Sequence, residues 1–116
     1  MNLKDISAAL LLIMICVGIG LGLHYAYAEF SLYRVVHKLK DAGWKLYLDT
    51  TKCGYCVRQV KFLREYLKEL ETIHCDDIQN KEKCKGVKAF PTWEKNEVKV
   101  PGSRFSVSDL EKLLEH

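Results

Sequence analysis

The hydrophobic positions of the chain follow two different patterns. Residues 6–28 contain no Asp, Glu, Lys or Arg, and Ala8 to Leu23 is an unbroken run of apolar residues. Beyond residue 28, apolar residues recur at the spacings of amphipathic helices and short strands. The pattern predicts one N-terminal hydrophobic helix followed by a small folded domain.

Residues 6–28 are long enough to cross a bilayer, which needs about 20 apolar residues in a helix. Tyr25 and Tyr27 lie near the end of this stretch, where aromatic side chains commonly anchor a helix at the membrane interface. We therefore expect a transmembrane anchor. A signal peptide cleaved after Ala28 is the main alternative, because residues 26–28 have the small-x-small form of a cleavage site. A buried core helix is disfavoured, since the remaining chain is too short to enclose it.

Two features of the sequence point to opposite sides of the membrane for the folded domain. Basic residues follow the hydrophobic segment at Arg34, Lys38, Lys40 and Lys45, whereas only Lys4 precedes it. The positive-inside rule would keep the domain in the cytoplasm. Five cysteines in 116 residues favour an oxidising compartment instead.

Residues 29–43 are expected to form an amphipathic connecting helix that ends at Gly43, and residues 44–116 a single folded domain. The helix that starts at Cys53 has its expected apolar face on Val57, Val60, Leu63, Leu67 and Leu70. Within the domain, strands are predicted over 44–49, 72–75, 92–95 and 97–100, and helices over 53–70, part of 76–86 and 107–114. This order predicts an α/β fold with a mixed sheet flanked by helices.

Net charge excludes one class of partner. Without residues 1–28, the chain has 17 basic and 14 acidic side chains. This excess is too small and too mixed in sign for a nucleic-acid surface, so no nucleic-acid partner is expected.

The motif Cys53-Gly54-Tyr55-Cys56 lies where a loop becomes a helix. A helix N-terminus offers unpaired N–H groups and a partial positive charge, which favour a thiolate. Lys52 adds a cation beside the first sulfur. We expect Cys53 to be the nucleophile and Cys56 the thiol that resolves a mixed disulfide, with no organic cofactor.

Two other interpretations of the cysteines remain open. One is a zinc site in which Cys75 and Cys84 join Cys53 and Cys56. It is weakened because Cys75 and Cys84 do not form a second tight knuckle, and no metal is assigned. The other is a purely structural disulfide at the CxxC motif, between Cys53 and Cys56.

The CxxC motif together with Phe90-Pro91-Thr92-Trp93 resembles thioredoxin-like proteins of glutaredoxin size. The resemblance implies a thioredoxin-like fold in which Pro91 is cis and lies beside the dithiol. It assigns Tyr55, Phe90 and Pro91 to a substrate groove, with the Phe90 backbone presented to an incoming peptide. Gly102 matches the small residue found near that groove.

The run from Ile73 to Trp93 is similar to the thioredoxin-like domains fused to vitamin K epoxide reductase homologues. That likeness implies that Cys75 and Cys84 form a second disulfide or a relay pair. Two separate thiols, or a bond to another chain, are the alternatives. Where thioredoxin has a buried acid, this chain has Tyr47, with Asp49 nearer to the motif.

The sequence thus predicts a membrane-anchored thiol–disulfide oxidoreductase that acts on protein thiols and disulfides and exchanges electrons with an upstream redox partner. The alternatives are a non-catalytic peptide-binding module and a small zinc-binding membrane protein. Cys16, His24 and His74 are assigned no catalytic role. Trp93 is expected at the edge of the groove.

Overall fold

The computed structural model describes residues 2–116, in which a long helix α1 (Leu3–Ala42) is followed by a small α/β domain. The chain divides into two compact units, one ending at Ser31 and the other spanning Leu32–His116.

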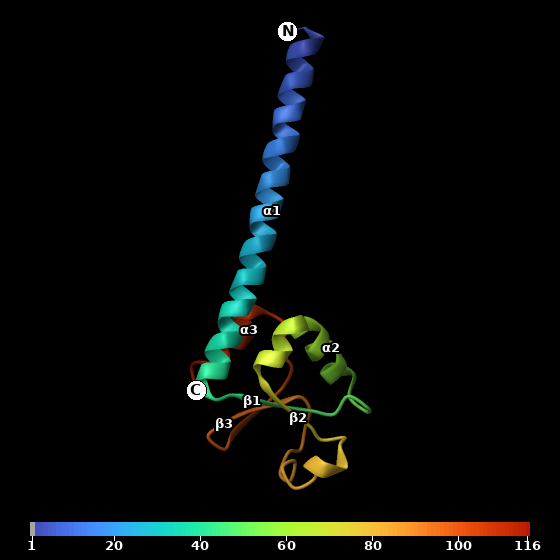
Figure 1. The fold of residues 1–116 in the computed structure, drawn as a ribbon, viewed down its shortest axis with the longest axis vertical. Coiled ribbons are helices and arrows are strands. Elements are labelled where there is room, and N and C mark those ends of the chain that lie inside the picture. Colours follow the sequence, from blue (N-terminus) through green and yellow to red (C-terminus); the bar gives the residue numbers. More distant parts are fainter. Residues whose placement is uncertain (1) are drawn as a thin grey trace. The chain divides into compact units, whose positions relative to one another are not determined.

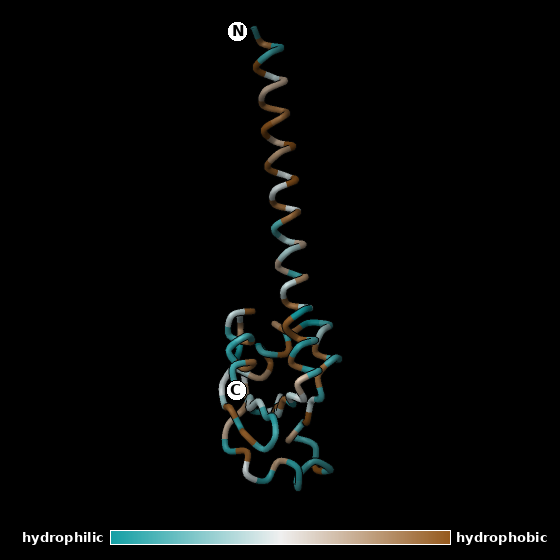
Figure 2. The backbone as a smooth tube through the Cα atoms, turned by 90° about the vertical axis from the view of Figure 1, so that its left-hand side faces the viewer, coloured by the Kyte–Doolittle hydropathy of each residue, from teal (hydrophilic) through white to brown (hydrophobic). Residues whose placement is uncertain are grey.

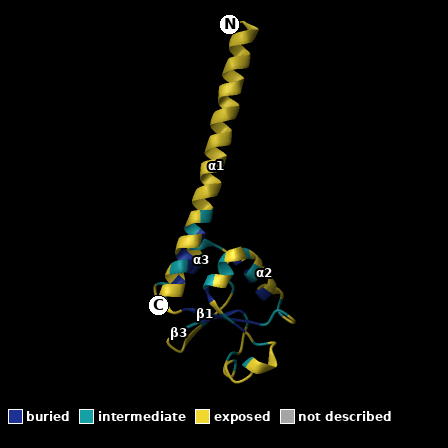
Figure 3. Ribbon diagram, viewed as in Figure 1, coloured by how far each residue is buried: buried dark blue, intermediate teal, exposed yellow. Residues whose placement is uncertain are grey.

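The first unit is the apolar part of α1. Its large apolar side chains are exposed along its length, and Figure 3 colours this part of α1 almost entirely as exposed. Brown, hydrophobic positions recur along the same stretch of the tube in Figure 2. The most apolar window has a mean hydropathy of 2.6 and none of it is buried. The predicted N-terminal apolar helix is confirmed. It is long and apolar enough to span a membrane, and a signal sequence has the same properties.

The connecting helix expected from residue 29 does not begin there, because α1 continues without a break to Ala42. No Gly or Pro lies between residues 23 and 42 to interrupt the helix. Gly43 ends it with a φ of 89°, as the sequence predicted.

The second unit contains a mixed four-stranded sheet in the order β2-β1-β3-β4. β1 is parallel to β2 and antiparallel to β3, and β3 is antiparallel to β4. The strands are β1 (Lys45–Leu48), β2 (Glu71–His74), β3 (Thr92–Lys95) and β4 (Val98–Pro101). The other elements are α2 (Gly54–Leu63), α3 (Val107–Leu113) and the short 3-10 helices η1 (Arg64–Glu69) and η2 (Ile78–Asn80).

Helices α2 and α3 and the C-terminal end of α1 pack on one face of this sheet (Figure 1). Leu46, Leu48 and Trp93 point to that face and are fully buried. They share one hydrophobic cluster with Leu32, Val35, Val36 and Leu39 of α1, Cys56 and Leu63 of α2, and Leu110 and Leu113 of α3. The predicted mixed sheet with helices is therefore present. Trp93 belongs to this core, so its expected place at a groove edge is wrong.

The opposite face has no helix among the described elements other than η2. Tyr47, Ile73 and Thr92 are buried there, outside the helix-side cluster. Most of the segment that joins β2 to β3, including η2, lies on this side of the sheet (Figure 1), while Phe90 near its end packs against the helix-side cluster. The Tyr47 hydroxyl donates to Glu94 Oε1 at 3.3 Å on this face. Burial, followed by the charge of Glu94, raises the pKa of Tyr47.

The predicted helix 53–70 is interrupted at Arg64, which has a φ of 53°. α2 ends at Leu63, and η1 takes the chain on to β2. Hydrophobic periodicity did not reveal this break, because apolar residues before and after Arg64 pack against the same hydrophobic cluster. These residues are Val60, Leu63, Leu67 and Leu70. The buried face of α2 also differs from the expected one. Its buried residues are Cys56, Gln59 and Leu63.

The β3–β4 turn combines one suitable residue with one unsuitable one. Asn96 and Glu97 both have positive φ values, 51° and 67°. Two-residue hairpins favour this conformation, and Asn tolerates it better than Glu. We expect Glu97→Gly to raise the free energy of unfolding by about 0.5 kcal/mol, because relief of left-handed strain exceeds the extra entropy that Gly loses.

Urea unfolding of the full chain in detergent measures this change. Asn96→Gly is the matched control and should leave stability unchanged or slightly lower. A loss of stability in Glu97→Gly would show that the Glu97 backbone is not strained.

Candidate functional site

Cys53 is the N-cap of α2, and its sulfur does what a capping oxygen usually does. The Cys56 N–H donates to Cys53 Sγ at 3.2 Å. Ser, Asp or Asn normally supplies this acceptor at a helix start. The helix therefore directs an N–H and its partial positive charge at a partly exposed sulfur, the atom that carries negative charge in nucleophilic attack.

Cys56 is fully buried one turn into α2. The backbone N–H of Asp49, just after β1, lies 3.5 Å from Cys56 Sγ as a donor. Burial, together with the hydrogen bond to Cys53, raises the pKa of the Cys56 thiol to about 12. The two cysteines therefore differ in access: Cys53 is partly exposed and Cys56 is buried.

The carboxylate of Asp49 is held by Thr51, and its charge still helps to raise the pKa of Cys56. Asp49 Oδ1 accepts hydrogen bonds from the hydroxyl of Thr51 at 2.8 Å and from its N–H at 3.2 Å. These bonds, helped by the charge of exposed Lys52, lower the pKa of the Asp49 carboxyl. This carboxylate stays ionised at neutral pH, so it is not suited to hold a proton for Cys56.

The segment before β3 approaches Cys53 although it lies 37 positions away. Cys53 Sγ is 3.3 Å from the carbonyl oxygen of Phe90 and donates to it. The Phe90–Pro91 peptide bond is cis, as the resemblance implied, and Pro91 is fully buried. Gly102, with a φ of 117°, donates its N–H to the Pro91 carbonyl at 3.0 Å, so the residue after β4 lies beside this segment.

Cys75 and Cys84 are joined by a disulfide, which is one of the two arrangements that the family resemblance implied. The bond closes the segment that leaves β2. Cys75 also donates its N–H to the Leu48 carbonyl at 2.7 Å, which ties it to the end of β1. Because these two sulfurs are bonded to each other, they are not ligands of a four-cysteine zinc site with Cys53 and Cys56. Among residues 2–116, no cluster of three or more His, Cys, Asp or Glu side chains could hold a metal ion.

Tyr55, between the two cysteines of the motif, is 60% exposed. The guanidinium carbon of Arg58 lies 5.6 Å from the centre of its ring, one turn further along α2. This contact supports the ring from one side at the exposed N-terminal turn of the helix. An aromatic surface is thus available next to the reachable sulfur.

Gln59 contributes to the site in a way that the sequence analysis missed. Its fully buried amide donates to the Arg104 carbonyl at 2.7 Å and accepts from the Arg104 N–H. This pair of bonds fixes the segment after β4 against α2. The signal in the sequence was a polar residue three positions after Cys56, on the face that the helix buries. Val57, expected on the buried face, is partly exposed instead.

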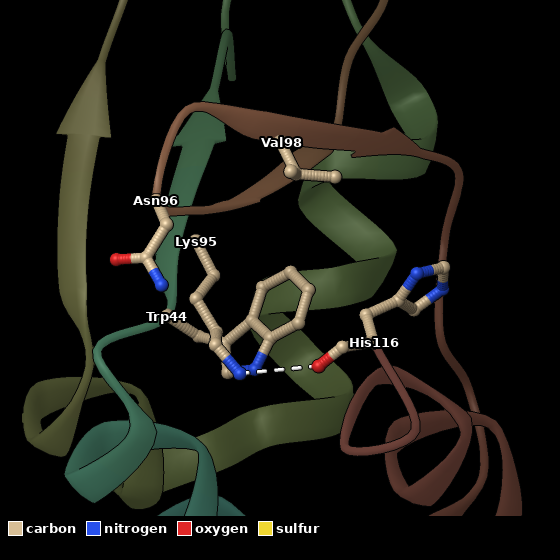
Figure 4. Close-up of a pocket in the computed structure, with 5 residues that line it drawn as sticks. All are labelled: Trp44, Lys95, Asn96, Val98 and His116. Carbon is tan, nitrogen blue, oxygen red and sulfur yellow. Dashed lines mark hydrogen bonds between the residues drawn. The ribbon is translucent and has the colours of Figure 1, made fainter.

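The structure gives two other residues considered in the sequence no contact with the dithiol. Cys16 is exposed on the apolar part of α1, and His74 is exposed on the edge strand β2. A cavity of about 320 Å³ lies at the β3–β4 turn, lined by Trp44, Lys95, Asn96, Val98 and His116 (Figure 4). Lys95 Nζ donates to the His116 carbonyl across it at 3.1 Å. None of the predicted site residues lines this cavity.

Comparison with known proteins adds no relative: no protein-family model matches the chain, and no curated protein sequence matches it significantly.

Proposed function

We propose that the protein is a thiol–disulfide oxidoreductase that exchanges disulfides with protein substrates through Cys53 and Cys56. One observation carries the proposal: the sulfur of partly exposed Cys53 contacts both the Cys56 N–H in the first turn of α2 and the Phe90 carbonyl, while the Cys56 side chain is buried. A structural cysteine pair has no need of this asymmetry, whereas a nucleophile and a resolving thiol require it.

In the reducing direction, the Cys53 thiolate attacks one sulfur of a substrate disulfide. The substrate S–S bond breaks, one substrate sulfur leaves as a thiolate, and a mixed disulfide forms on Cys53. The Cys56 thiolate then attacks Cys53 Sγ and releases the second substrate thiolate. Two electrons pass to the substrate, whose two thiolates take up protons, and the protein is left with a Cys53–Cys56 disulfide. The reverse sequence donates that disulfide to a dithiol.

Two features near Cys53 can contact the peptide around the substrate cysteine. Tyr55, two residues further along the chain, offers an exposed ring, and the backbone carbonyl of Phe90 meets the Cys53 sulfur. An extended peptide that pairs with this backbone brings its sulfur to Cys53. Lys52 adds positive charge next to the reacting sulfur.

The element order β1-α2-β2-β3-β4-α3, with a CxxC at the start of α2 and a cis proline before β3, supports assignment of the domain to the thioredoxin-like superfamily. We also assign residues 6–28 as a membrane anchor that keeps the domain at a membrane surface, close to an upstream redox partner that resets the dithiol. Cleavage after Ala28 and secretion is the alternative for this segment.

The resolving step should depend strongly on pH. Burial keeps Cys56 protonated at neutral pH, and only its thiolate attacks the mixed disulfide. Because the pKa is raised, the thiolate fraction increases as pH rises towards that pKa. We expect the resolution rate to rise about tenfold per pH unit between pH 6 and 9.

The measurement starts from the protein with glutathione on Cys53 and follows glutathione release by acid quench and mass spectrometry. A rate that stays constant above pH 7 would contradict the assignment of buried Cys56 as the attacking thiol.

Catalysis of protein disulfide reduction tests the proposed function itself. The full chain in detergent micelles should accelerate the reduction of insulin by dithiothreitol well above the rate in micelles alone. Peptide binding without acceleration would instead support the non-catalytic binding module.

A further inference from the structure

The segment 75–91 joins β2 to β3 and delivers the Phe90 carbonyl to Cys53. It has little regular structure of its own, since η2 is its one helical element and covers three residues. Such a segment has many accessible conformations unless its ends are fixed. The contacts at both of its ends therefore decide where the Phe90 backbone lies.

The first fixed point is the Cys75–Cys84 disulfide. Cys75 is held to the Leu48 carbonyl by its N–H, and the residue after Leu48 is Asp49, whose N–H meets Cys56 Sγ. On the other side of the bond, the Val87 N–H donates to the Cys84 carbonyl at 3.1 Å. The disulfide thus connects the strand end beside the dithiol to a point six positions before Phe90.

The second fixed point is Thr92, the first residue of β3. Its hydroxyl donates to the Ala89 carbonyl at 2.6 Å, across Phe90 and Pro91. Thr92 is buried, and its backbone is paired in register with Tyr47 of β1 and Pro101 of β4. The short stretch that carries Phe90 is therefore held from the sheet as well as from the disulfide.

We propose that Cys75, Cys84 and Thr92 are positioning residues that hold the Phe90 backbone against Cys53 and so determine recognition of peptide substrates. This inference rests on the proposed function. A peptide needs the Phe90 backbone as a docking edge, whereas a small thiol reaches Cys53 without it. Loss of either fixed point should therefore weaken peptide recognition and leave the chemistry at Cys53 intact.

The test uses the oxidised full chain in detergent, with the single substitution Cys16→Ala as background because Cys16 is a further free thiol. A synthetic dithiol peptide reduces the Cys53–Cys56 bond and becomes a cyclic disulfide, so electrons balance without another reagent. 2-Mercaptoethanol, two molecules of which form one disulfide, is the probe without a peptide backbone. Acid quench and mass spectrometry follow both reactions.

In this background, Cys75→Ala/Cys84→Ala and Thr92→Val should each raise the half-saturating peptide concentration by about fivefold or more. The maximal rate and the 2-mercaptoethanol rate should stay within about twofold of the background protein. Thr92→Val keeps all cysteines, so the proposal remains testable if the double variant folds poorly. Val36→Ala, in the helix-side core, is the destabilised control that touches neither fixed point.

Unchanged half-saturation in Thr92→Val and in a folded double variant would overturn the inference. So would an equal rise in Val36→Ala, or a parallel loss of reactivity toward 2-mercaptoethanol, because each would indicate a general loss of structure. Failure of the proposed function looks different: the background protein itself would then accept no electrons from the peptide.

Discussion

Replacing Cys53 with Ser should abolish disulfide exchange. The Cys53 sulfur forms and breaks every bond in the proposed mechanism, and a serine hydroxyl does not exchange with disulfides. We expect the rate of insulin reduction to fall by at least about 10³-fold, to the rate in micelles alone.

The fold should survive this substitution, which makes the result interpretable. Cys53 is the N-cap of α2, and Ser is among the most favoured residues there. The midpoint temperature of thermal unfolding should therefore be unchanged or slightly higher. Cys16→Ser is the matched control, since it removes a thiol from the apolar part of α1 and should keep full activity. Residual activity of Cys53→Ser near that of the parent would refute the mechanism.

Replacing Cys56 with Ser should trap the substrate on the protein. Cys53 keeps its helix N-terminus and its contact with Phe90, so the first attack proceeds. The second step has lost its thiolate, and the mixed disulfide then persists until an external thiol attacks it. We expect its lifetime to increase by about 100-fold or more.

Intact mass under non-reducing conditions measures the trapped species, with a peptide disulfide as substrate. The adduct should approach one per chain and map to Cys53. Cys53→Ser/Cys56→Ser is the control and should form none. An adduct that is as short-lived as in the parent would show that another group resolves it, while mapping to Cys16 would show that the exposed thiol of α1 reacts instead.

Much of the fold could be predicted because its signals are local. Ser106 caps α3 by accepting from the Asp109 N–H at 3.0 Å, which the Ser-x-x-Asp spacing predicts. Gly43 ends α1, and the β3–β4 hairpin turns at Asn96. The helical start at the CxxC motif was predictable for the same reason, since a strand-like run, a short loop and an amphipathic run follow one another there.

The rest depends on contacts between distant residues, which spacing does not encode. Cys53 and Phe90 meet across 37 positions, and the approach was expected only through a family resemblance. The orientation of Asp49 was open for a similar reason: its carboxylate accepts hydrogen bonds from Thr51, while its backbone N–H donates to Cys56 Sγ. The break at Arg64 was hidden because the same apolar residues pack on either side of it.

A redox titration of the Cys53–Cys56 pair tests the central claim most directly. The full chain in detergent is equilibrated in buffers of defined reduced-to-oxidised glutathione ratio, its thiols are labelled after acid quench, and the label is located by mass spectrometry. The proposed mechanism predicts one reversible two-electron couple at Cys53 and Cys56, with a reduction potential between roughly −270 and −120 mV, the range of known thiol–disulfide oxidoreductases. A pair whose labelling does not respond reversibly to the buffer would contradict it.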